Sequence, residues 1–504
     1  MTRSSASDQP LSLDALLALV AAGVLARVLL AGLAEPWTDE LYFAVTASHV
    51  PGELSIYASE LGSTIRSLDA SPVLERMPYL STEAHPPLAL LCQAPVHHAA
   101  PLVVLRLPSL FFSVATLAIA VAWVGWRWGR PAALAAALLL ATAPPLLLHG
   151  TEVRPYSGAI FFGLVTSILA CGPRDDRRWA GWRYALYGVL AALGMWTHYY
   201  VGALLPAHAV GALACWRRSA ADRRHARGIL LGLLLAGLLF ALWAPVPLAR
   251  ARSFAAVGDA APLEATDLLL LPFEALGACG IAGAAIALCA MVAGTVALAR
   301  RAPRDALVLG LALPAALALA LVAPHVHAPA GKHLAAAAAP ALLLAAAAVT
   351  RARRWAQVVT WTLLGVLVLA SARAVVVPRE PWRQAWLAAS LALQPGDVVA
   401  FSPPHAKLGF QRQASLAGVE LLPADDTVRA LQGWSLSPLG MPGLTDTEQS
   451  THWILAADVP RETPQLLRVN LFGPHALELP AQPPEELLRG LEGSILLELG
   501  SVAR

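Results

Sequence analysis

Residues 11–34 read LSLDALLALVAAGVLARVLLAGLA, and this stretch decides the class of fold. It is 24 residues long, from Leu11 to Ala34, and an apolar segment of roughly 20 residues crosses the hydrocarbon core of a bilayer. The run is too long for the apolar part of a signal peptide and lacks an A-x-A cleavage site. We therefore expect it to stay as the first transmembrane helix. Arg27 lies inside it and must find a polar partner or an aqueous cavity.

The composition agrees with lipid as the main solvent of the chain. Of its 504 residues, 57% are hydrophobic and only 14% are charged. The net charge is +3 and comes almost wholly from arginine, because Lys332 and Lys407 are the only two lysines. No polybasic domain exists that would suggest a nucleic-acid partner. The first expected partner is therefore the lipid bilayer.

Eleven segments are apolar enough to be membrane spans. They are approximately 11–34, 103–126, 131–148, 155–172, 182–197, 199–215, 228–248, 267–299, 305–323, 333–350 and 355–377. The apolar stretch from Pro86 to Val96 has 11 residues and is interrupted by proline, which favours a re-entrant or interfacial piece. The chain is therefore expected to be an all-α polytopic membrane protein with about 11 transmembrane helices.

Arginine placement predicts the orientation. With the N-terminus in the cytoplasm, the inside connections hold 17 arginines and the outside connections hold 7 arginines and lysines. The first outside loop then covers residues 35–102, within a transmembrane module of residues 1–377. Residues 378–504 follow outside, where short apolar runs at 397–402, 453–456 and 494–499 predict a small α/β domain. The expected location is the bacterial inner membrane.

The spacing of cysteines and histidines gives little support for a disulfide or a metal site. The five cysteines form no CxxC pair, and four lie in apolar segments where they read as packing residues. Histidines 85, 97, 98, 325 and 327 have no spacing that defines a metal site. We expect no metal and no cofactor.

Short polar motifs recur on the predicted outside face. They are Trp37-Thr38-Asp39-Glu40, His85-Pro86-Pro87-Leu88, Arg106-Leu107-Pro108-Ser109, Glu152-Val153-Arg154-Pro155-Tyr156, Thr197-His198-Tyr199-Tyr200 and Lys332-His333. Each has an ordinary structural explanation. Carboxylates start helices, arginines reach for headgroups and aromatic side chains form interfacial belts. Their gathering on one face is what favours a site.

In order and spacing these motifs resemble the bacterial GT-C-fold glycosyltransferases of family 39, the dolichyl-phosphate-mannose protein mannosyltransferase and aminoarabinose transferase type. The resemblance covers roughly residues 11–400 and includes Pro381-Trp382-Arg383. The family commonly has an Arg-Tyr pair where this chain has Lys332-His333. Lysine keeps the positive charge but cannot form the two parallel hydrogen bonds that a guanidinium forms with phosphate. The resemblance implies an inverting transfer of a sugar from a polyprenyl-phosphate donor to an envelope glycolipid, glycan or protein outside the cytoplasm.

Site roles follow from this chemistry. By its position after the first helix, Asp39 corresponds to the family's catalytic acid and would act as general base, with Glu40 orienting or replacing it. Arg154 suits phosphate because guanidinium binds it bidentately, and Lys332 is the second cation. The remaining candidates for substrate binding are Glu152, Tyr156, His85, Arg106, His198, Tyr199 and His333.

Two other functions stay open. A transporter would carry ionisable or Gly/Pro-broken positions deep in several helices, often in two similar halves. Beyond Arg27 the sequence shows no clear sign of either. A non-catalytic scaffold for envelope polysaccharide assembly is the third possibility.

Overall fold

A computed structural model describes the chain as two compact units. The described residues are 13–34, 36, 40–41, 43–44, 47, 86–96, 100–172, 181–245, 247, 271–272, 275–276, 280–322, 331–350, 361, 365, 382–392, 398–402, 407–419, 421–423, 451–455, 465–471, 487–488 and 495–501. The first unit comprises Met1–Leu33 and Thr46–Val377, and the second comprises Ala34–Val45 and Pro378–Arg504. This division differs from the expected one because the segment after the first helix belongs to the second unit.

The first unit is helical throughout its described part. Its α-helices are α1 (Leu13–Leu33), α6 (Pro87–Gln93), α7 (Leu102–Leu105), α8 (Leu107–Trp128), α9 (Arg130–Thr142), α10 (Pro144–Gly150), α11 (Tyr156–Cys171), α12 (Trp182–Thr197), α13 (Leu204–Ala214), α14 (Ala220–Ala241), α17 (Gly280–Ala299), α18 (Pro303–Val322) and α19 (Ala335–Ala347). Three 3-10 helices join them: η3 (Tyr199–Ala203), η4 (Gly331–Leu334) and η5 (Ala348–Thr350).

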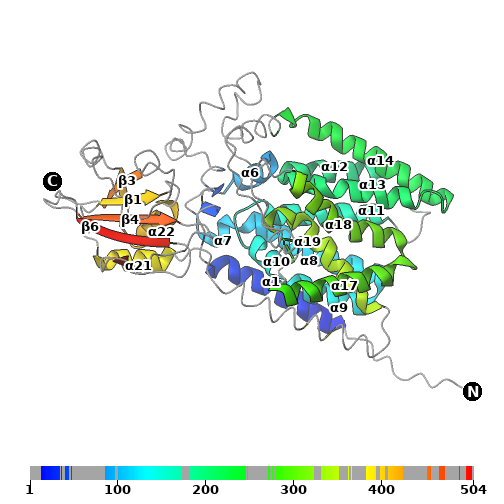
Figure 1. Cartoon of the computed structure of the whole chain (residues 1–504), viewed down its shortest axis with the longest axis horizontal. Helices are drawn as coiled ribbons and strands as arrows, with labels where there is room; N and C mark the ends of the chain where they lie inside the picture. Colours follow the sequence, from blue (N-terminus) through cyan, green and yellow to red (C-terminus); the bar gives the residue numbers. More distant parts are fainter. Residues whose placement is uncertain are drawn as a thin grey trace, which may run out of the picture. The chain divides into compact units, whose positions relative to one another are not determined.

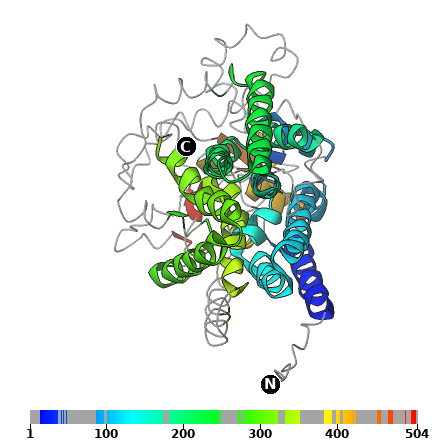
Figure 2. The same cartoon turned by 90° about the vertical axis from the view of Figure 1, so that its right-hand side faces the viewer.

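The core of this unit is the alanine-rich helix α19. All 13 of its residues are buried, and it packs against α9, α11, α17 and α18 (Figure 1). Small side chains let helix backbones approach closely inside a membrane bundle. Gly294 of α17 is one such position, because a Cβ there would overlap the carbonyl of Leu344. Figure 2 shows α1, in dark blue, beside the cyan helices along one side of the unit.

Five described helices are long and apolar enough to cross a membrane: α1, α8, α14, α18 and the stretch Gly331–Thr350. The bent pair α9 and α10 raises the number to six. Shorter apolar helices cover Tyr156–Cys171, Tyr199–Ala214 and Ala285–Ala299. The chain is therefore mainly helical, with several helices long and apolar enough to cross a membrane, while the number eleven remains a prediction. The expected span at 355–377 lies almost wholly outside the described residues. Helix α6, with seven residues, is too short to span.

A break between α9 and α10 divides the expected span at 131–148. The two helices meet at 57°, where Pro144 and Pro145 follow the end of α9. In a continuous helix, the amides of residues 144 and 145 would bond the carbonyls of Leu140 and Ala141, but proline has no N–H. The buried guanidinium of Arg27 supplies the donors instead, with Nη2 2.6 Å from Leu140 O and Nη1 3.4 Å from Ala141 O.

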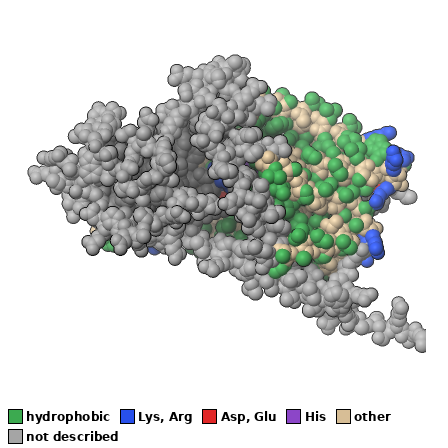
Figure 3. All heavy atoms as spheres, viewed as in Figure 1, with side chains coloured by type: hydrophobic (Ala, Val, Ile, Leu, Met, Phe, Trp, Pro, Cys, Tyr) green, Lys and Arg blue, Asp and Glu red, His purple; other side chains and the backbone are tan. Residues whose placement is uncertain are grey.

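Described arginines gather at one end of the helical unit. Figure 3 shows Lys and Arg side chains gathered at one end, with hydrophobic side chains over the flank. Arginines stand where α8 meets α9, where α13 meets α14 and where α17 meets α18; these are Arg127, Arg130, Arg217, Arg218, Arg223, Arg224, Arg227, Arg300, Arg301 and Arg304. Successive helices reverse direction at these short connections, so the described arginines of these three turns mark one end of the bundle.

The second unit contains a six-stranded sheet. Its strands are β1 (Val398–Ser402), β2 (Leu421–Pro423), β3 (Thr451–Leu455), β4 (Gln465–Leu471), β5 (Leu487–Leu488) and β6 (Ile495–Ser501), in the order β2-β3-β1-β4-β6-β5. Strands β1 and β4 pair in parallel, with Val398 opposite Leu466, and the other neighbours are antiparallel. Two helices, α21 (Trp382–Ala392) and α22 (Lys407–Leu416), meet through Trp386 and Phe410, whose ring centroids are 5.2 Å apart. Strands β1, β3 and β6 overlap the three apolar runs noted in the sequence.

Candidate functional site

The turn between α10 and α11 forms the centre of the candidate site. Glu152 and Arg154 lie in this turn, and both are buried. The Nδ1 atom of His149, near the end of α10, lies 2.5 Å from Oε1 of Glu152. A carboxylate only accepts hydrogen bonds, so Nδ1 of His149 carries the proton in this pair. Tyr156 then begins α11, fully within the bundle.

A row of aromatic rings extends from this turn to two other connections. The ring of Tyr156 lies between His149 and His198, with centroid distances of 4.8 and 5.3 Å. His198 directly follows α12, and its ring centroid lies 5.6 Å from that of Tyr200. The Tyr200 ring in turn stacks on His333 of η4, with centroids 5.1 Å apart and planes at 11°. Residues from three separate motifs, at 152–156, 197–200 and 332–333, therefore meet in one cluster.

The cluster is rich in positive groups. The guanidinium carbon of Arg154 lies 5.9 Å from the centroid of the Tyr156 ring, within cation–π range. Burial lowers the pKa of His198 to about 3, with smaller contributions in the same direction from His333, Arg154, His149 and Lys332. His198 is therefore neutral at physiological pH. Its Nδ1 accepts the backbone N–H of Tyr200 at 3.4 Å, which fixes the start of η3.

Hydrogen bonds from α1 and α8 hold the α10–α11 turn in place. Ser109 Oγ donates to the carbonyl of Arg154 at 3.2 Å, so the motif at 106–109 contacts the motif at 152–156. One turn further along α8, Ser113 Oγ donates to Leu146 O of α10 at 3.2 Å and accepts from Nε of Arg27 at 2.7 Å. These bonds tie the position of α10, and with it His149, to α1 and α8.

Arg106 and Tyr199 make contacts of a more structural kind. The Nη1 atom of Arg106 donates to the carbonyl of Ala31 at 3.1 Å and reaches that of Leu30 at 3.5 Å, so it caps the end of α1. Tyr199 Oη accepts from Nε1 of Trp243 at 3.1 Å, which links η3 to the end of α14. Both residues border connections at the same end of the bundle as the cluster.

The acidic motif after the first helix is only partly described. Asp39 and His85 lie outside the described residues. Glu40 is buried with 0% exposure and belongs to the second unit, together with the rest of Ala34–Val45. The assignment of the general base to Asp39, with Glu40 as its neighbour, therefore remains a prediction.

His149 is a member of the cluster that the sequence motifs did not include. It lies directly after the segment expected as a span, and its partner Glu152 is three residues later, just past the end of α10. That i, i+3 spacing is the signal that points to the pair. Two further buried donors, Ser157 Oγ and Trp196 Nε1, make no hydrogen bond within the described part of the chain.

No group of three or more His, Cys, Asp or Glu side chains suited to a metal ion occurs among the described residues. The cluster instead offers guanidinium, ammonium, imidazole and phenol groups, which bind phosphate and hydroxyl oxygens. Its one described carboxylate, Glu152, is held by His149. The arrangement can therefore neutralise an anion and hydrogen-bond a polyol at the boundary of the apolar helices.

Comparison with known proteins finds no matching family model and no matching curated sequence. The fold and the cluster together define a class, a helical membrane protein with a buried cationic and aromatic cluster at the end of its helices opposite the arginine-rich turns.

Proposed function

We propose that this chain is an inverting glycosyltransferase that moves a sugar from a polyprenyl-phosphate donor to an envelope acceptor. The observation that carries the proposal is the meeting of Arg154, Lys332 and His333 with Tyr156 and His198 at one end of an apolar bundle. A polyprenyl-phosphate sugar needs an apolar site for its tail, cations for its phosphate and hydrogen-bonding groups for its sugar. All three features are adjacent here.

In this proposal Arg154 and Lys332 stabilise the leaving phosphate. The sugar–phosphate bond breaks with the electron pair going to the phosphate oxygen, so cations help more than a general acid. The acceptor hydroxyl attacks the anomeric carbon from the opposite face and gives its proton to a carboxylate, which inverts the configuration. Asp39 is the proposed base, and Glu152 is the alternative because it lies inside the described cluster.

The proposal also puts the site outside the cytoplasm. The arginine-rich turns mark the cytoplasmic end by the usual bias of basic residues, and the cluster lies at the other end of the helices. On this view the chain crosses the inner membrane eleven times. Residues 378–504 then form an α/β domain outside.

Donor binding tests the role of Arg154. Arg154→Lys keeps the charge but removes the planar fork, so we expect it to weaken binding of the polyprenyl-phosphate donor without fully abolishing it. Arg227→Lys is the matched control, because the guanidinium carbon of Arg227 lies 5.6 Å from the centroid of the Trp216 ring in a similar cation–π contact at the arginine-rich end. Equal donor affinity in the parent and in Arg154→Ala protein would remove Arg154 from the site.

Sugar transfer tests the general base. Proton transfer requires an approach of roughly 2.6–3.2 Å, so Asp39→Asn should lose nearly all transfer and Asp39→Glu much of it. Asp14→Asn, in the first turn of α1, is the control carboxylate. Loss of transfer in Glu40→Gln but not in Asp39→Asn would reverse the two roles. Loss only in Glu152→Gln would move the base to Glu152.

A transporter remains the second candidate, because polar groups lie deep among the apolar helices. His208 of α13 is buried and bonded to Tyr187 Oη of α12 and Ser167 Oγ of α11, each at 3.0 Å. His208 thus links α11, α12 and α13 through both ring nitrogens, and buried ionisable residues within membrane helices often mark transport pathways. Movement of labelled sugar lipid or free sugar across proteoliposomes, unaffected by Asp39→Asn, would favour the transporter.

A further inference from the structure

A second polar site lies at the arginine-rich end of the bundle, away from the cluster. Its cavity, of about 450 Å³, lies where the turn between α8 and α9 meets the turn between α17 and α18. It is lined by Gly125, Trp126, Arg127, Trp128, Gly129, Leu298, Arg301, Ala302 and Thr350. Ser109, which contacts the cluster, and Gly125, which lines this cavity, lie 16 residues apart on α8, or about 24 Å along the helix axis.

One wall of the cavity is a fixed ion pair. Arg127 donates through Nε and Nη2 to both carboxylate oxygens of Asp305 at 2.8 Å, and Trp128 Nε1 donates to the same carboxylate at 3.2 Å. Asp305 is fully buried, so this pair fastens the end of α8 to the start of α18. The charge of Arg127 is thereby neutralised within the protein.

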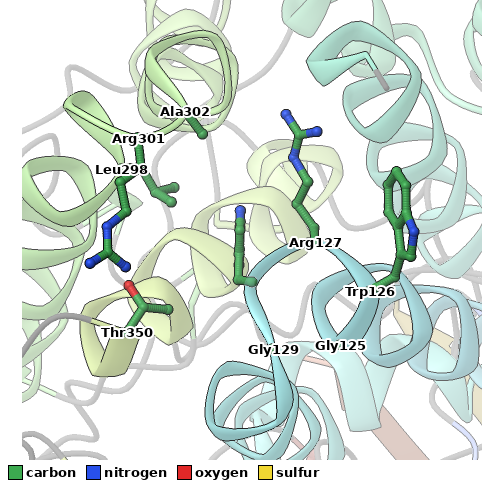
Figure 4. A pocket seen from close by; sticks show the side chains of 9 residues that line it. Gly125, Trp126, Arg127, Gly129, Leu298, Arg301, Ala302 and Thr350 are labelled. Atoms are coloured by element: carbon green, nitrogen blue, oxygen red, sulfur yellow. The ribbon is translucent and has the colours of Figure 1, made fainter. Parts of the chain in front are cut away.

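Arg301 provides a positive charge at the cavity that is not paired within the described part of the protein. It is exposed, and among the described residues no carboxylate pairs with it. Figure 4 shows Arg301 and the Thr350 side chain on one side of the cavity and Trp126 on the other. An exposed guanidinium beside a cavity of this size is suited to bidentate binding of a phosphate group.

Two helices also begin at this cavity. Gly129, with φ of 94°, is the residue before α9, and Ala302 is the residue before α18. The first turn of a helix has amides without partners inside the helix and a partial positive charge, both of which favour an anion. The first-turn residues of both helices do not line the cavity, and Pro131 and Pro303 have no N–H, so the inference depends on Arg301.

The position of the cavity indicates a lipid as the source of the phosphate. It lies at the end of apolar helices, at the level where bilayer headgroups meet arginine-rich turns. On α8, Ile119 and Trp126 are exposed by 38% and 55% and lie seven residues apart, so they share one helix face. This face offers an apolar surface for acyl chains beside a polar pocket for the headgroup.

We infer that this cavity binds the phosphate headgroup of an anionic membrane lipid and thereby clamps the α8–α9 turn to the α17–α18 turn. Arg301 contacts the phosphate, and Trp126 contacts the glycerol and the upper acyl chain. The site does not depend on the proposed function, because it lies at the other end of the bundle and shares no residue with the cluster.

Lipid binding to the detergent-purified full chain, followed by native mass spectrometry, tests this site with phosphatidylglycerol against phosphatidylcholine. We expect a preference for phosphatidylglycerol that Arg301→Gln weakens by about tenfold, as for the loss of a charge-assisted hydrogen bond. The adjacent exposed Arg300 does not line the cavity, so Arg300→Gln is the matched control and should change the affinity little. Arg301→Lys should retain part of the preference.

Three results would overturn the inference. Equal losses in Arg300→Gln and Arg301→Gln would show a general attraction of basic residues to anionic lipid. An unchanged affinity in Arg301→Gln, with folding verified by thermal unfolding, would place the lipid elsewhere. If inorganic phosphate or glycerol phosphate displaced phosphatidylglycerol at a concentration equal to that of the lipid, the cavity would instead be a site for a soluble phosphate.

Discussion

Replacing Arg27 by leucine removes the donors that hold the break between α9 and α10. The carbonyls of Leu140 and Ala141 would lose their bonds to the guanidinium, and an unsatisfied buried group costs about 1–3 kcal/mol. The gross loss is therefore about 2–6 kcal/mol, offset in part by no longer burying a charge. We expect a net decrease in the free energy of unfolding, measured by chemical denaturation in mixed micelles.

A double-mutant cycle isolates this mechanism. Changing Pro144 and Pro145 to alanine restores two backbone N–H groups that can bond the same carbonyls along a continuous helix. The loss caused by Arg27→Leu should therefore shrink by about 1 kcal/mol or more in the alanine background. Equal losses in both backgrounds, or no loss from Arg27→Leu in the parent, would refute the account of this break.

Three further predictions concern the helical unit. Burial holds the pKa of the His198 imidazole at about 3, against an ordinary value of 6.5. As the pH falls from 6.5 towards 3, the imidazole therefore gains a proton in the unfolded chain but not in the folded one. Stability should then drop towards low pH by up to about 1.4 kcal/mol per unit, and His198→Asn, which keeps a cap acceptor, should flatten that dependence in denaturation measured across pH 4–7. Gly294→Ala should cost about 1–3 kcal/mol because its Cβ overlaps a backbone carbonyl, whereas Gly237→Ala, with open space around it, should cost nothing in the same assay. A reporter active only outside the cytoplasm, fused after Arg504, should be active, and an inactive but expressed fusion would contradict the eleven-span topology.

Long apolar runs located most helices, because a membrane-crossing helix has a fixed minimum length. Pro144 and Pro145 stand inside one such run, and their missing amides were the available signal for the break that the structure contains. The bonding partners of Arg27 lie up to 114 residues away in sequence, so only tertiary packing reveals them. The pairing of Arg127 with Asp305 is hidden for the same reason.

The candidate site was predictable to the extent that its residues stand in short polar connections. Arg154, Glu152, Tyr156 and His198 are polar or aromatic groups at the ends of apolar runs, and the structure brings them together. His149 escaped notice because it ends an apolar run instead of standing in a motif. The sequence also does not show which groups a polar residue will bond. Arg106, for example, bonds a carbonyl at the end of α1, a contact that only the folded structure reveals.

Mass spectrometry of envelope glycans and glycolipids tests the central claim whichever sugar is transferred. Cells that lack this chain should lose one sugar-bearing envelope species and accumulate its unmodified acceptor. The parent chain should restore that species, and Asp39→Asn protein expressed at the same level should not. An unchanged set of envelope glycans and glycolipids in cells without the chain would contradict the assignment as a glycosyltransferase.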